Sequence, residues 1–110
     1  MGNIQLAIEG QDAVEATKSL LAIPELSGEW QPVDGNQKAL TLATIATIVG
    51  IVGGTLKVAD QIHKWYKQWK KGKADHTIDK VVIVGADGQR LVLENASVED
   101  ISTLLEGLAK

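Results

Sequence analysis

The sequence predicts an α+β fold, with a small, mostly antiparallel sheet of four strands, one long central helix and two shorter helices. Three observations support this prediction: alternating apolar and polar residues at 3–9, a proline-free helical pattern at 37–71, and a turn sequence between two apolar runs near the end. We expect the order β-α-β-α-β-β-α in a single domain spanning 1–110, because 110 residues suit one domain.

The first third of the chain predicts a strand, a short helix and a weaker strand. Residues 3–9 place Ile, Leu and Ile on one face, which is typical of a half-buried strand. A helix then starts at Asp12 and ends before Pro24, because proline disfavours helical geometry in the residue that precedes it. Residues 28–33 form a weak strand, and Pro32 favours an edge position for it.

The middle of the chain predicts one long helix over 37–71, with a kink near Gly53 and Gly54. Its first half, 39–56, is 18 residues without a charge. In its second half, apolar and aromatic residues recur at helical spacing with lysines between them, and Gly72 fits a helix C-terminus.

The last third predicts a β-hairpin followed by a helix. Residues 81–84 and 91–93 are strands, and the glycine-containing stretch 85–88 is the turn between them. Ser97 caps the final helix. The expected buried face of that helix is Val98, Ile101, Leu104, Leu105 and Leu108.

Charge is distributed unevenly along the chain. The net charge is −3, yet six of the eleven basic residues lie between Lys57 and Lys73, beside one acid, Asp60. The overall acidity argues against a nucleic-acid-binding protein. The absence of cysteine excludes disulfides and thiolate metal sites.

The uncharged run suggests a membrane or oligomer helix. Its length as a helix is about 27 Å, close to the roughly 30 Å hydrocarbon thickness of a bilayer. Small residues at four-residue intervals would let helices approach closely. The alternative is a central helix buried against the sheet. The residues assigned to the membrane or oligomer helix are Ile45, Ala46, Ile48, Gly50, Ile51, Gly53 and Gly54.

Aromatic and basic residues gather directly after this run. Such a cluster is typical of a membrane interface. It could also stack on single-stranded nucleic acid, or be a solvated helix face whose tryptophans fold onto the core. We assign it to an interface without nucleic acid. Its members are Lys64, Trp65, Tyr66, Lys67, Trp69, Lys70 and Lys71.

The chain shows no pattern for catalysis or for a cofactor. His63 follows Asp60 by three residues, but a metal site needs further ligands, and His76, Asp75 and Asp79 are the remaining candidates. A surface histidine bonded to a carboxylate is the simpler interpretation. The serines lie in no nucleophile motif. We therefore expect no enzyme activity, no metal and no cofactor.

Four segments carry a resemblance to a known family: NIQLAIEG, LLAIPELSG, HKWYKQWKK after a small-residue segment, and VVIVGADGQRLVLENASVEDISTLLEGL. Together they resemble the effector-associated constant component family, which is found beside effector and NTPase genes in bacterial conflict (immune) systems. This family has no catalytic motif that could be assigned to residues of the chain. It implies an accessory or adaptor role beside effectors such as proteases.

Two functions follow as hypotheses. In the first, the chain is a non-enzymatic effector component of a bacterial defence system, whose central helix oligomerises or inserts into the inner membrane on activation. In the second, it is a soluble adaptor that binds a protease-like effector or an NTPase. A small hydrolase is a remote third. We expect a cytoplasmic protein, because no secretory signal opens the sequence. We also expect homo-oligomers, formed through the small residues of the central helix.

Overall fold

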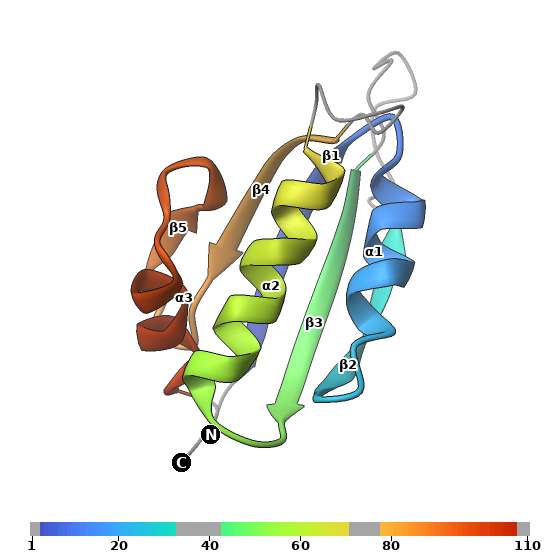
Figure 1. Cartoon of the computed structure of the whole chain (residues 1–110). Helices are drawn as coiled ribbons and strands as arrows, with labels where there is room; N and C mark the ends of the chain where they lie inside the picture. Colours follow the sequence, from blue (N-terminus) through green and yellow to red (C-terminus); the bar gives the residue numbers. More distant parts are fainter. Residues whose placement is uncertain (1–2, 33–42, 71–77, 108–110) are drawn as a thin grey trace.

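A computed structural model describes residues 3–32, 43–70 and 78–107 of the chain. These residues form five strands, three α-helices and one short 3-10 helix (Figure 1). Their order is β1 (Ile4–Gly10), α1 (Ala13–Leu21), β2 (Leu26–Pro32), β3 (Ala43–Ile51), α2 (Thr55–Trp69), β4 (Ile78–Val84), β5 (Arg90–Val92), η1 (Leu93–Asn95) and α3 (Val98–Leu105).

The strands form one antiparallel sheet in the order β2-β3-β1-β4-β5. The first strand in sequence is therefore the central one, with β3 on one side and β4 on the other. Strands β2 and β5 are the edges. The predicted α+β class is confirmed, as is the edge position of β2. The predicted number of four strands and their order are wrong, because the described residues hold five.

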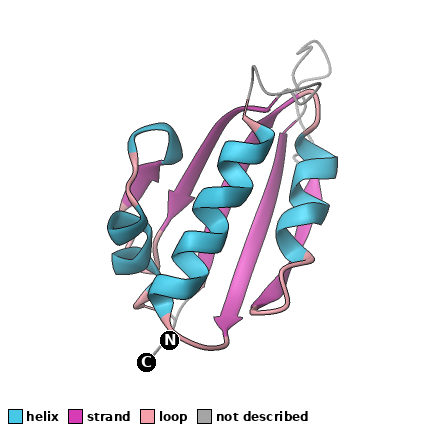
Figure 2. Cartoon of the chain, viewed as in Figure 1, coloured by secondary structure: helices cyan, strands magenta, loops and turns pink. Residues whose placement is uncertain are grey.

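The three described helices cover the same face of the sheet (Figures 1 and 2). The alternation in β1 fits this arrangement: Ile4, Leu6 and Ile8 are fully buried beneath the helices, whereas Gln5 and Glu9 are exposed. A single cluster of buried apolar side chains joins this face to all three helices. The core therefore lies between the sheet and the helical layer.

The long central helix is not present. Residues Ala43–Ile51 form β3, and α2 begins only at Thr55. Thr44, Ala46 and Ile48 are buried on the helix side, while the residues between them face the other side, a period of two. Threonine, isoleucine and valine also favour strands, because their branched side chains pack well on a pleated surface. Residues 39–42 lie outside the described residues.

A glycine separates the strand from the helix. Gly53 has φ +93°, which L side chains rarely adopt, and it turns the chain from β3 into α2. The expected kink near this position is therefore a complete break between two elements. The helical spacing predicted after it is confirmed, since Val58, Ala59 and Ile62 are buried in α2. The predicted helix end at Gly72 lies outside the described residues.

The C-terminal predictions largely hold. The hairpin turn between β4 and β5 contains Gly88 with φ +91°, and the Gly85 amide donates to the Gln89 carbonyl over 2.7 Å. Ser97 accepts a hydrogen bond from the Asp100 amide, and Asp100 accepts one from the Ser97 amide. This reciprocal capping box fixes the start of α3. Leu108 lies outside the described residues.

Candidate protein interaction surface

The aromatic half of the predicted interface is part of the core. Trp65 and Tyr66 are only 4% and 8% exposed. The Trp65 indole N–H donates to the Ala16 carbonyl in α1 over 2.8 Å. Trp69 is partly buried against the same core. Trp65 and Tyr66 therefore join α2 to the rest of the fold, and the prediction that they form an interface belt is wrong for them.

The lysines of the same helix point the other way. Lys64 and Lys67 are exposed on the outer side of α2, whereas Lys70 is exposed just after the helix ends. The Lys64 ammonium lies 3.1 Å from the Asp60 carboxylate, one helical turn earlier, and both side chains are well exposed. An exposed ion pair of this kind, four residues apart on a helix, contributes about 0.3–0.5 kcal/mol to stability. These lysines form a solvated helix face, and Lys71 lies outside the described residues.

A mixed polar depression lies where Tyr66 meets the sheet. Its volume is about 320 Å³, and Lys70, Ile78, Asp79 and Glu94 complete its lining. Burial raises the pKa of Tyr66, and the nearby Glu94 carboxylate raises it further. The phenol is therefore held in its protonated form, unlike the lowered pKa that an activated nucleophile requires.

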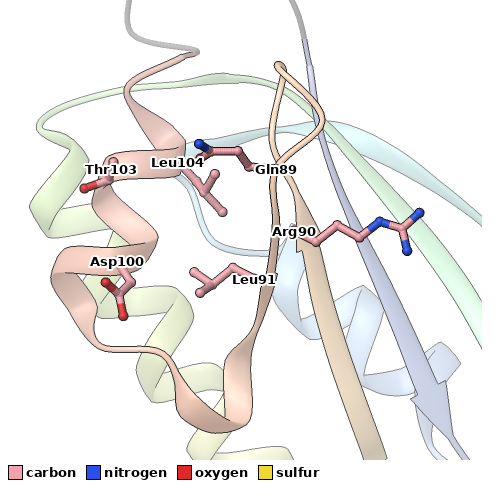
Figure 3. Close-up of a pocket in the computed structure, with 6 residues that line it drawn as sticks. All are labelled: Gln89, Arg90, Leu91, Asp100, Thr103 and Leu104. Atoms are coloured by element: carbon pink, nitrogen blue, oxygen red, sulfur yellow. The ribbon is translucent and has the colours of Figure 1, made fainter.

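The depression between β5 and α3 has a volume of about 340 Å³ (Figure 3). Leu91 and Leu104 project into it, whereas the Arg90 side chain is directed away from α3. Asp100 belongs to the capping box, and the Thr103 hydroxyl donates to the Glu99 carbonyl within α3. Both polar groups thus stabilise the helix, which leaves an apolar floor without a pair of groups suited to acid–base chemistry.

The residues assigned to a membrane or oligomer helix divide between two environments. Ala46 and Ile48 are fully buried under the helices, whereas Ile45 lies on the opposite side of β3. Gly50, Gly53 and Gly54 have open space where a Cβ would stand, so they support no close packing. Ile51 packs partly against the core. Close approach occurs instead at Gly28, where a Cβ would overlap the Thr47 carbonyl oxygen.

Val49, Val52 and Leu56 are three exposed apolar residues close together in the chain, where β3 ends and α2 begins, and we call them the apolar tip. Their exposed fractions are 59%, 65% and 58%, and they are the large apolar residues that stand out as exposed in the described parts of the chain. All three belong to the uncharged run. Sequence reasoning missed the tip because it assigned them to a continuous helix.

The backbone of the tip is held in place. The Val52 amide donates to the Glu25 carbonyl over 2.9 Å. The Lys57 ammonium lies 3.6 Å from the Glu25 carboxylate. The Thr55 and Ser102 hydroxyls are hydrogen-bonded over 2.8 Å, which ties the first turn of α2 to α3. The exposed side chains are thus presented on an ordered backbone, which lowers the entropic cost of binding.

The comparisons with family models, curated proteins and solved structures find no match to this chain. Within the described residues, no helix combines the length and apolar character needed to cross a membrane. No group of three or more metal-ligating side chains occurs in that part of the chain. Of the candidate metal ligands, Asp60 and His63 lie in α2 and Asp79 lies in β4, whereas Asp75 and His76 lie outside the described residues.

Proposed function

We propose that this chain is a non-enzymatic adaptor of a bacterial defence system, and that it binds a protease-like effector or an NTPase through the apolar tip. The concentration of exposed Val49, Val52 and Leu56 at one end of the fold carries this proposal. Exposed apolar clusters on a folded domain are characteristic of interaction sites. The defence context rests on the family resemblance of the sequence.

The tip is suited to a modest, reversible contact. Fully burying a valine or leucine side chain contributes about 1.5–3 kcal/mol. Since these three residues are 58–65% exposed, docking would remove over half of each side chain from water. Burial of each of these residues then contributes on the order of 1 kcal/mol to the binding free energy.

The adaptor hypothesis requires less rearrangement than the insertion hypothesis. Inserting 43–51 into a membrane as a helix would remove β3 from between β1 and β2. Both ladders would break, and Ala46 and Ile48 would leave the core. Binding through the tip leaves every element in place.

Co-expression with the proteins encoded beside this chain tests the adaptor role. We expect the tagged chain to capture one of them, and Val52→Ser combined with Leu56→Ser to reduce the captured amount at least about tenfold, corresponding to 1.4 kcal/mol. Both positions are exposed, so the melting temperature should change little. The matched control is Lys64→Gln with Lys67→Gln, on the outer side of α2, which should leave capture unchanged.

Two results would contradict this proposal. The first is capture that survives the tip substitutions and is lost in the lysine control, which would place the site on α2. The second is recovery of the chain in the membrane fraction without a protein partner, with the tip substitutions abolishing it. That result would assign the tip to lipid.

A further inference from the structure

The side of the sheet opposite the helices presents an apolar stripe. We call this side the open face, because no described helix lies on it (Figure 1). The registered pairs place Ile45, Ala7, Val82 and Val92 in one row across β3, β1, β4 and β5. These four residues are only partly buried. An apolar row in the middle of an exposed sheet is typical of a packing surface.

The next row along the open face has opposite charges at its two ends. Register places Glu29, Thr47, Gln5, Val84 and Arg90 side by side, from edge strand β2 to edge strand β5. Glu29 and Arg90 are both exposed. Figure 3 shows the Arg90 side chain directed away from α3, consistent with this placement. The row is acidic at the β2 edge, basic at the β5 edge and uncharged between.

A shallow depression lies on the acidic half of the same face. Glu29, Gln31, Ile45 and Thr47 line it together with Trp30, and its volume is about 180 Å³. Its lining is mainly polar, with a carboxylate on one side. A long cationic side chain such as arginine matches it in shape and charge.

We propose that a second copy of this chain covers the open face, giving a two-fold symmetric dimer in which the two sheets pack face to face. A two-fold axis running along β1 places the β2 edge of one copy against the β5 edge of the other. Arg90 of each copy then meets Glu29 and the depression of its partner, so the charge pair forms twice. A two-fold interface requires such self-complementarity, and the charge order along the row supplies it.

The central strand is compatible with this axis. Glu9 lies near the two-fold axis at one end of β1, and Lys80 on β4 is the registered neighbour of Glu9. The dimer therefore brings two acids and two bases together at that end. Ala7, a small residue in the middle of the apolar row, lets the two sheets approach along the axis.

The size of the open face predicts a weak dimer. The four longer strands, spaced about 4.8 Å apart, cover about 19 by 20 Å over six residues each, and the three-residue β5 adds about half a strand, which gives roughly 430 Å² for each copy. The total of about 900 Å² lies in the range of weak, transient interfaces. We therefore expect a dimer that dissociates on dilution, at micromolar concentrations.

Sedimentation of the purified full-length chain tests this proposal without any partner, so its outcome is separate from that of the adaptor proposal. The expected result is a shift from an 11.7 kDa monomer toward twice that mass as concentration rises. Glu29→Arg and Arg90→Glu should each weaken the dimer at least about tenfold by placing like charges together. The double variant with both changes should restore dimerisation, because the pair is re-formed with its charges exchanged.

The control is Lys67→Glu, an equal charge change on the helix side, which should leave the dimer unchanged. Circular dichroism confirms that each variant is folded. A chain that stays monomeric up to the highest concentration overturns the proposal. A dimer unaffected by either charge reversal, or one that the exchanged pair fails to rescue, overturns it as well.

Discussion

At the residue scale, hydrogen bonds and close contacts distinguish core residues from surface residues that look alike in sequence. Trp65 lies between lysines, yet its indole is buried and bonded to the Ala16 carbonyl. The helical period of α2 contained this information, because 62, 65, 66 and 69 share one face and the lysines share the other. The interface hypothesis relied on the mixture of aromatic and basic residues and neglected their helical spacing. For that reason it placed the aromatic residues on the surface.

Replacing Trp65 with Phe should therefore destabilise the fold rather than alter a surface. The change removes the bond to Ala16 and leaves unfilled space between α1 and α2. We expect a loss of about 1–3 kcal/mol in the free energy of unfolding, measured by urea denaturation. The control is Lys64→Gln on the outer side of the same helix, which should change stability by less than about 0.5 kcal/mol. An unchanged midpoint for Trp65→Phe would contradict the buried position.

Tyr66 links stability to pH in the alkaline range. Its pKa in the folded chain is raised above the ordinary value near 10, mainly by burial and secondly by Glu94. The folded state thus binds the phenolic proton more tightly than the unfolded state does. The protonated phenol therefore stabilises the folded state. This stabilisation is complete below pH 10 and is lost as pH rises through the pKa of Tyr66 in the folded state. Tyr66→Phe should flatten the decline in melting temperature above pH 10, and Glu94→Gln should produce a smaller change in the same direction.

At the element scale, local signals predicted the elements whose ends they define. The α3 capping box, the glycine turn before β5 and the alternation of β1 are each set by neighbouring residues. The segment 43–51 was different, because its outward residues Ile45 and Val49 are apolar too. With apolar residues on both faces, the period of two is obscured and a helix fits the pattern as well. Only the pairing with β1 and β2 decides it.

The capping box gives a prediction for α3. Ser97→Ala removes the side-chain acceptor for the Asp100 amide and should cost about 1 kcal/mol of stability. Asp100→Asn keeps a side-chain oxygen that can accept from the Ser97 amide, and should cost less. Urea midpoints measure both. Equal effects of the two substitutions would contradict this order and show that the charge of Asp100 at the start of the helix contributes as much as the Ser97 side-chain cap.

At the scale of the whole molecule, the sheet is covered on one side by the helical layer, and β1 and β3 lie inside it with partners on both edges. Their backbone groups are bonded into the sheet, and Leu6, Ala46 and Ile48 anchor them in the core. Strands in this position open only with the whole fold. The edges β2 and β5 have a free side in the described part of the chain, so they can open alone.

Hydrogen exchange separates this structure from one that releases residues 43–51. We expect the amides of β1 and β3 to exchange most slowly, at the rate of global unfolding, and those of β2 and β5 to exchange faster. Adding anionic vesicles should leave protection of β3 unchanged, because its release would break two ladders and expose the core residues Ala46 and Ile48. The control is a vesicle-free sample at the same protein concentration, since dimerisation through the open face would itself slow exchange. Selective loss of protection in 43–51 with vesicles, while β1 and β4 stay protected, would contradict the role of β3 as a permanent strand and favour the insertion hypothesis.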